Sequence, residues 1–250
     1  MASTFLIPIK RSTNAFPVFF VPSAGTTVLS LAHLARSLKS PHAFYGFEFS
    51  QLPTGVERPV TIEQIASLCV KEIRAVQESG PYFICGHCWG GAVAFEIAAK
   101  FEASGDNVTG LLMLESVPPS GSEATAFNPP APDRPVVTKA VSDLCEQVRK
   151  KLSRLPAELA QKFGPVSWEL IDLALRYRAT TRIRAPLFLI RTPTHPKAVF
   201  QNWSHLTSGH VDERIVPGDT FSILVAPVVK IVGEELDAAL RDHSDQSLRR

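Results

Sequence analysis

The sequence lacks any apolar run long enough to cross a membrane, has almost no excess charge and contains little cysteine. A membrane-spanning helix needs about 20 consecutive apolar residues, and no stretch of the 250-residue chain reaches that length. The net charge of +2 is too small to indicate a surface for nucleic acid or for an anionic membrane. We also find no internal repeat.

The few cysteines and histidines do not form a metal-binding pattern. The four cysteines are Cys69, Cys85, Cys88 and Cys145, and the seven histidines are scattered without the spacing of zinc ligands. The first residues contain too short an apolar run for a secretory signal. Few cysteines together with no secretory signal indicate a reducing compartment, where disulfides are rare, so we predict a cytoplasmic protein. Because no zinc-ligand spacing is present, we also predict that the protein holds no metal.

What the chain does contain is enough apolar sequence for one sizeable domain. With 45% hydrophobic residues, residues 1–250 are expected to form a single unit with a substantial core. Short apolar runs alternate with amphipathic segments, which is typical of βαβ units and a mostly parallel α/β sheet flanked by helices. We predict strands at 5–9, 17–21, 43–48, 82–85, 110–114, 186–190 and 213–216, and helices at 28–38, 62–76, 92–98 and 224–240, with a frayed polar tail from 241.

This alternation is interrupted between residues 117 and 185. Residues 117–135 are rich in proline and serine, and two helical patterns follow before the next strand. An insertion there leaves the sheet at the carboxyl end of its strands, where ligands bind in such folds. We therefore predict a helical lid at 117–185; a plain helical layer is the alternative.

The stretch with the strongest chemical signal is Gly86-His87-Cys88-Trp89-Gly90. It lies between a predicted strand and a predicted helix, and it is a G-x-C-x-G form of the nucleophile elbow. Glycines on both sides allow the chain to approach closely while Cys88 stands at a strained apex. The start of a helix lowers the pKa of a thiol and offers N–H groups to an oxyanion.

Two other interpretations of this stretch stay open. Cysteine is often only a small buried hydrophobic residue. Cys85 and Cys88 also form a C-x-x-C pair between a strand and a helix, as in thioredoxin-like redox centres. That fold would not require Gly90 and Gly91 directly after Trp89, and we expect Cys85 to be buried at the end of the strand.

Several segments together resemble the thioesterase domains that end polyketide and nonribosomal peptide synthetases, a branch of the α/β-hydrolase superfamily. The resemblance covers nearly all of the chain outside the predicted lid. It is carried by residues 5–9, 17–25, 45–47, 86–91, 112–116 and 216–224, with Trp203 and Pro227.

The resemblance implies a set of site residues with three departures from the usual pattern. Cys88 takes the place of the usual serine nucleophile, and Glu115, 27 residues later, takes the place of the usual aspartate. Thr220 occupies the position of the usual histidine. The oxyanion donors would be the backbone N–H groups of Trp89 and of Ser23 or its neighbour Ala24.

Other residues could replace the missing base. His195 follows a predicted strand and so lies on the catalytic side of a parallel sheet, whereas His210 precedes one and should lie at the opposite end. His87 adjoins the nucleophile, but the elbow should turn its side chain away. Asp219, next to Thr220, is a weaker alternative base.

The resemblance implies an enzyme that handles acyl chains carried on the phosphopantetheine arm of a carrier protein, with no cofactor of its own. We expect Cys88 to accept the chain and pass it to an amine, hydroxyl or carbon nucleophile more readily than to water, by cyclisation, condensation or transfer, because activating water requires a base. The alternatives are a catalytically silent pseudoenzyme that binds an acyl chain or carrier protein, and a cysteine hydrolase similar to dienelactone hydrolase. The basic residues Arg149, Lys150, Lys151 and Arg154 would suit an acidic carrier protein; a solvated helix face is the alternative.

Overall fold

The fold is a seven-stranded sheet between two layers of helices. A computed structural model describes residues 5–24, 26–49, 61–119, 143, 146–147, 150, 153–154, 168–194, 201–220 and 222–247. The strands are β1 (Leu6–Lys10), β2 (Val18–Val21), β3 (Phe44–Phe47), β4 (Tyr82–His87), β5 (Val108–Leu114), β6 (Leu187–Arg191) and β7 (Val211–Ile215). The helices are α1 (Val28–Ser37), α2 (Ile62–Val76), α3 (Gly90–Ala103), α6 (Trp168–Arg176) and α7 (Val228–Ser247), with a 3-10 turn η3 (Gln201–His205).

The strand order is β1-β3-β2-β4-β5-β6-β7, with only the edge strand β1 antiparallel to its neighbour. Every predicted strand is present within a few residues of its expected bounds, and the α/β fold class is confirmed. Parallel pairing brings the carboxyl ends of β2 to β7 to one edge of the sheet. Residues that directly follow these strands are therefore brought together in space.

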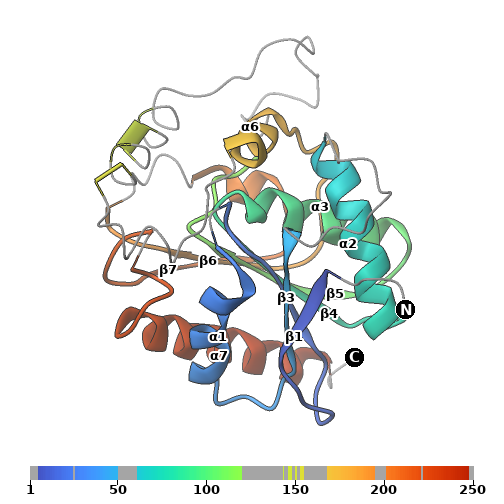
Figure 1. Cartoon of the computed structure of the whole chain (residues 1–250). Coiled ribbons are helices and arrows are strands. Elements are labelled where there is room, and N and C mark those ends of the chain that lie inside the picture. The colour runs from blue at the N-terminus through green and yellow to red at the C-terminus, as the bar shows by residue number, and fades with distance from the viewer. Residues whose placement is uncertain are drawn as a thin grey trace.

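Successive side chains along the central strands enter two separate cores, because neighbouring residues of a strand point to opposite faces. Ile84 belongs to the core under α2 and α3, whereas Phe83 and Cys85 belong to the core under α1 and α7. Figure 1 shows the two helix pairs on opposite sides of the sheet. β4 and β5 are buried along their whole length.

The last helix differs from the prediction at both ends. α7 begins at Val228 rather than near Leu224, directly after Pro227, which has no N–H to donate to a preceding helical turn. It continues to Ser247, so the expectation of a frayed tail from Arg241 is wrong for most of that segment.

The predicted lid is described only in part. Residues 120–142 and 155–167 lie outside the described residues, so the lid stays a prediction. α6 is described, and its partly buried side chains Leu170 and Leu173 pack against the core under α2 and α3. The hydroxyl of Tyr177 donates to Glu96 of α3 at 2.5 Å, which fixes the end of α6 to the body of the domain.

Candidate active site

Cys88 lies at the apex of a sharp turn between β4 and α3, as the elbow pattern predicts. Its φ of 55° is left-handed, a conformation that costs a residue with a side chain about 1 kcal/mol or more. Its N–H donates to the carbonyl of Leu114 in β5 at 2.9 Å, which ties the apex to the next strand. The side chain is half-buried, whereas the residues on both sides of it are buried.

The glycines around Cys88 are required by close backbone contacts. A Cβ on Gly86 would lie 2.6 Å from the carbonyl oxygen of Gly90, and one on Gly91 would lie 2.3 Å from the Cβ of Ser116. Both distances are far below van der Waals contact, so side chains cannot be accommodated without movement of the backbone. The glycine spacing thus serves the tight strand-to-helix turn.

The two backbone segments predicted to hold an oxyanion also touch each other. A Cβ on Gly90 would lie 2.6 Å from the carbonyl oxygens of Val21 and Pro22, so the start of α3 abuts the end of β2. Ser23 follows immediately and begins the turn into α1. The structure therefore brings the Ser23 segment against the start of α3, one residue after Trp89.

Glu115 is the second residue of the site and directly follows β5. It is 2% exposed, and its φ of 52° is again left-handed. Its carboxylate accepts hydrogen bonds from the backbone N–H of Thr192 and from the hydroxyls of Thr192 and Thr220, at 2.5, 3.3 and 3.0 Å. Because Cys88 N–H binds the residue before Glu115, the structure brings Cys88, Glu115 and Thr220 into one region.

Thr220 is half-buried in the loop after β7. Its hydroxyl donates to the carboxylate of Glu115, the group that would orient a histidine at this position. Asp219 has contacts inside the same loop: its carboxylate accepts from the N–H of Ser222 at 2.9 Å and from the Ser222 hydroxyl at 3.0 Å. His210 lies at the start of β7, where its carbonyl accepts from Leu187 N–H, and so at the end of the sheet away from Cys88, as predicted. His195 lies outside the described residues.

Sequence reasoning missed two residues that support the site. Thr192 follows β6, and only the order of strands in the sheet places it beside Glu115. Ser116 is buried; its hydroxyl donates to the carbonyl of Gly86 at 3.1 Å, and its own carbonyl accepts from the indole of Trp203 at 3.0 Å. Ser116 thereby joins the base of the elbow to the segment before β7.

Cys85 and Cys69 are fully buried free thiols, and burial raises the pKa of both well above the ordinary value. Cys85 points into the core under α1 and α7, as expected for the end of a buried strand. A thioredoxin-like centre needs a reactive pair. The burial of Cys85 argues against that interpretation.

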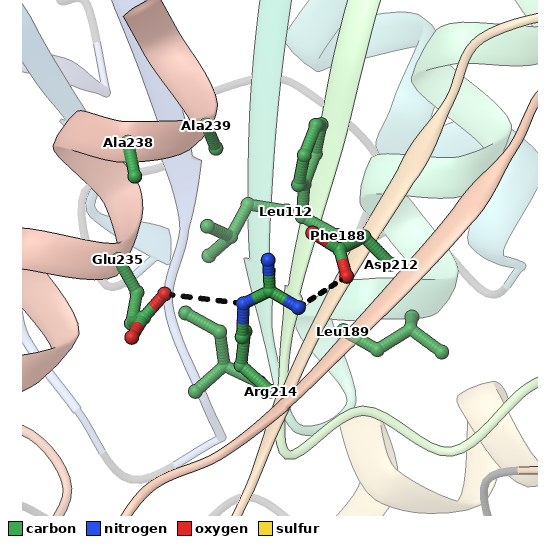
Figure 2. A pocket seen from close by; sticks show the side chains of 9 residues that line it. Leu112, Phe188, Leu189, Asp212, Arg214, Glu235, Ala238 and Ala239 are labelled. Atoms are coloured by element: carbon green, nitrogen blue, oxygen red, sulfur yellow. Dashed lines mark hydrogen bonds and ion pairs between the residues drawn. The ribbon is translucent and has the colours of Figure 1, made fainter. Parts of the chain in front are cut away.

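A shallow hollow between β6, β7 and α7 is unrelated to this site (Figure 2). In Figure 2, Arg214 lies between Asp212 and Glu235, and the guanidinium pairs with them at 2.5 and 3.6 Å. The positive charge of Arg214 is therefore already compensated by the two carboxylates and does not favour the binding of an anion. Among the described residues, no three histidine, cysteine or acidic side chains are grouped as metal ligands, and no helix is long and apolar enough to cross a membrane.

Comparison with known proteins gives one family for most of the chain. The family model described as "Thioesterase domain" matches residues 16–238. The probable non-canonical nonribosomal peptide synthetase CymA of Salinispora arenicola is 24% identical over 94% of this chain, and atromentin synthetase greA of Suillus grevillei is 32% identical over 46%. The chain spans only 3% and 12% of those two proteins.

Solved structures show the same fold. The Vlm2 thioesterase domain bound with a dodecadepsipeptide has a TM-score of 0.63 at 23% identity, covering 94% of this chain and 97% of that one. The NocB thioesterase domain, in covalent complex with a fluorophosphonate nocardicin G analogue, has a TM-score of 0.68 at 20% identity, covering 95% and 100%.

Proposed function

Since the chain belongs to the thioesterase domain family over residues 16–238, we propose that it releases or transfers carrier-bound acyl or peptidyl chains through a thioester on Cys88. The observation that carries the proposal is the half-buried Cys88 at a left-handed apex, two residues before Gly90, the first residue of α3, which lies against Val21 and Pro22 at the end of β2. A similar arrangement of backbone amides stabilises the oxyanion in acyl transfer.

In the first half-reaction, the sulfur of Cys88 attacks the thioester carbonyl. The bond from the carbonyl carbon to the phosphopantetheine sulfur breaks, and that sulfur takes the proton released by the Cys88 thiol. The N–H groups of Ser23 (or Ala24) and Trp89 would bind the oxyanion. One thioester replaces another, so the exchange is nearly balanced, and a cysteine thiol is intrinsically a strong nucleophile.

The second half-reaction determines the product. A threonine hydroxyl cannot take a proton from water near neutral pH, and in this chain it instead donates to Glu115. We therefore expect an amine, hydroxyl or carbon nucleophile to accept the chain more readily than water, with Glu115 as the group that receives its proton. Cyclisation, condensation and transfer to a second substrate all fit this chemistry.

A carrier protein would be the partner of this reaction. The relative CymA is named as a probable non-canonical nonribosomal peptide synthetase, a class of enzyme in which chains are carried as thioesters. Of the predicted basic run, Lys150 and Arg154 are described and both are exposed. Lys150 already pairs with Glu146 at 2.7 Å, so Arg154 is the residue of the two that we expect to meet the acidic surface of such a partner.

Two alternatives differ in what happens to Cys88. A pseudoenzyme would bind an acyl chain or a carrier protein without forming a covalent adduct. A dienelactone-hydrolase-like enzyme would need a histidine after the last strand, and Thr220 occupies that position. We prefer acyl transfer to the pseudoenzyme because the half-buried Cys88 stands at a nucleophile elbow, and to the dienelactone-hydrolase-like enzyme because of Thr220.

Intact-mass measurement of the wild type and the Cys88→Ala variant with an acyl-pantetheine probe tests the proposal. The wild type should gain the acyl mass and the variant should not. The loaded protein is then exposed to buffer or to a panel of amines, and the amines should remove the acyl group faster. An unmodified wild-type Cys88 would support the pseudoenzyme instead, and rapid hydrolysis unaffected by Cys88→Ala would end the proposal.

Replacing Thr220 with histidine should change the partition between water and amines. An imidazole beside Glu115 can act as a general base, which typically accelerates proton transfer by about 10²-fold to 10⁴-fold. We expect the hydrolysis of the Cys88 thioester to rise by at least ~10²-fold in Thr220→His, measured as loss of acyl mass in buffer. Thr220→Val, which adds no base, is the control, and an equal rise there would contradict the explanation.

A further inference from the structure

We infer that Glu48 and Phe49, consecutive residues after β3, position the two backbone segments that would bind the oxyanion. This inference rests on the proposed function, because it concerns the N–H donors of Ser23 and Trp89. Neither residue is part of the elbow or of the acid–threonine pair. Each contacts a different donor segment.

Glu48 holds the segment that contains Ser23. Its side chain is 8% exposed, and its carboxylate oxygen Oε2 accepts from the N–H of Val28, the first residue of α1, at 3.2 Å. The residue before α1, Thr27, makes no side-chain cap of its own. The carboxylate therefore serves as the cap, and its charge is favourable at a helix N-terminus.

The position of Glu48 is itself fixed by the sheet. Its N–H donates to the carbonyl of Phe5 at 2.8 Å, next to the antiparallel pairing of β1 with β3. Only residues 22–27 separate β2 from α1. Because β2 holds one end of this connection and Glu48 holds the start of α1 at the other, the carboxylate limits how far Ser23 can move.

Phe49 holds the segment that contains Trp89. The two rings meet edge to face, with centroids 5.4 Å apart and an interplanar angle of 61°. Trp89 is 4% exposed, and within the described part of the chain its indole Nε1 has no hydrogen-bond acceptor. Ring packing rather than a hydrogen bond therefore orients this indole, and Phe49 supplies a defined contact of the favourable kind.

The two segments must be positioned to within a fraction of an ångström. Donors that stabilise an oxyanion act at about 2.7–3.1 Å from it, and a misplacement of about 1 Å costs roughly 100-fold in rate. Gly90 already lies against Val21 and Pro22, so the segments share one tight contact. Glu48 and Phe49 add a separate restraint to each segment, from adjacent positions after β3.

The test compares two reactions of the same thiol in the full chain. Acylation of Cys88 by an acyl-pantetheine creates an oxyanion, whereas alkylation by iodoacetamide displaces iodide from a saturated carbon and does not. In Glu48→Ala and in Phe49→Leu we expect the acylation rate to fall by about 10-fold to 100-fold while the alkylation rate stays within twofold. Glu48→Gln, which keeps an acceptor oxygen and the side-chain shape, should restore most of the acylation rate.

Two variants away from the site provide matched controls. Asp237 is 1% exposed and accepts from the N–H groups of Lys39 and Ser40 at 2.7 and 3.1 Å, so Asp237→Ala removes a buried carboxylate at the other end of α1. Phe16 packs on His42 with centroids 4.3 Å apart, so Phe16→Leu removes a comparable half-buried ring contact. Both controls should lower the urea midpoint and leave the acylation rate unchanged.

The outcomes separate this inference from the proposed function. If the wild type is acylated and Glu48→Ala and Phe49→Leu are acylated equally fast, the positioning role is refuted and the proposed function stands. If the Asp237→Ala control slows acylation as much as Glu48→Ala, or if alkylation falls in parallel, the effect is general loss of structure and the inference is again overturned. If the wild type itself is not acylated, both are refuted.

Discussion

Two side chains sit on left-handed backbone, Cys88 and Glu115, and within the described ranges no other residue except glycine does so. Such strain costs about 1–3 kcal/mol per residue and persists where the surrounding structure enforces it, often at functional sites. Two sets of contacts enforce this backbone. The N–H of Cys88 donates to the carbonyl of Leu114, and three donors surround the carboxylate of Glu115. The two positions that the family pattern marks as nucleophile and acid are thus the two that the backbone marks.

The thiols should differ sharply in reactivity. Cys88 is half-buried, whereas Cys69 and Cys85 have no exposed surface and a raised pKa. Because the thiolate is the reactive form, iodoacetamide under native conditions should label Cys88 at least ~10-fold faster than the other two. Peptide mapping at timed intervals measures this order, and early labelling of Cys85, or a Cys85–Cys88 disulfide, would revive the redox interpretation.

Gly91 offers a residue-scale test of the elbow. Gly91→Ala places a Cβ 2.3 Å from the Cβ of Ser116 and 2.4 Å from its hydroxyl oxygen, so it should destabilise the fold by about 1–3 kcal/mol.

In the Gly91→Ala/Ser116→Gly double variant, both atoms that clash are absent. Urea unfolding of the wild type, the single variants and the double variant should therefore give a loss smaller than the sum of the two single losses. Strict additivity would mean that the two residues do not clash.

Among the secondary-structure elements, α3 and α2 are formed on different principles. α3 is buried on nearly all sides and contains the glycines that allow its start to touch β2 and β5. α2 has an apolar face, including Ile65 and Ile73, and a polar face. The amphipathic pattern of α2 predicts that helix directly from the sequence. The near-continuous burial of α3, by contrast, follows from the position of this helix in the fold.

The start of α2 gives a prediction at this scale. The hydroxyl of Thr61, the N-cap residue of α2, accepts from the N–H of Gln64 at 3.2 Å. Thr61→Ala should therefore lower the free energy of unfolding by about 1 kcal/mol, measured by urea denaturation.

Ser67→Ala is a control on the same helix. Ser67 is exposed, and its hydroxyl donates to the carbonyl of Glu63 within the helix. This variant should change stability by less than about 0.5 kcal/mol. Equal losses in the two variants would show that Thr61 does not act as a cap.

In the whole molecule, the site exists only because parallel strands end at one edge. Each residue of the site follows a different parallel strand: Ser23 follows β2, Cys88 follows β4, Glu115 follows β5, Thr192 follows β6 and Thr220 follows β7. Together they span about 200 residues of sequence. At the opposite edge, the loop before β3 is fixed by buried polar contacts, including His42 Nδ1–H, which donates to the carbonyl of Phe16 at 2.8 Å.

This far edge should make stability depend on pH. Burial lowers the pKa of His42 below its ordinary value of 6.5, against smaller opposing effects of the Phe16 carbonyl and Asp237 and a smaller reinforcing effect of Lys10. The unfolded chain therefore binds a proton at this histidine more readily than the folded chain. The stability due to neutral His42 is complete above about pH 6.5 and is lost as the pH falls below it.

His42→Asn keeps an N–H donor at the same place and does not titrate. The difference in urea midpoint between pH 7.5 and pH 5.5 should be smaller in this variant than in the wild type. Subtracting the pH dependence of the variant from that of the wild type removes the effect of carboxylate titration, which both proteins share. An identical pH dependence of the two proteins would show that His42 is not the source.

The sequence by itself determined the elements and the identity of the chemical groups. Apolar runs bounded by glycine and proline predict all seven strands, and the glycines around Cys88 predict the elbow, because these signals depend on neighbours within a few residues. The family pattern marked Glu115 and Thr220. The far end of α7 was missed, since a polar composition does not by itself end a helix.

The tertiary structure alone decided which residues meet. That Thr192 donates to Glu115, that Glu48 caps α1 and that Phe49 orients Trp89 follow from strand order and from contacts between segments 20 to 77 residues apart. No local pattern records them, because a hydrogen bond between distant segments depends on how the sheet is assembled. The physical reason is that parallel pairing fixes which strand ends are neighbours, and the chemistry proposed here takes place among those ends.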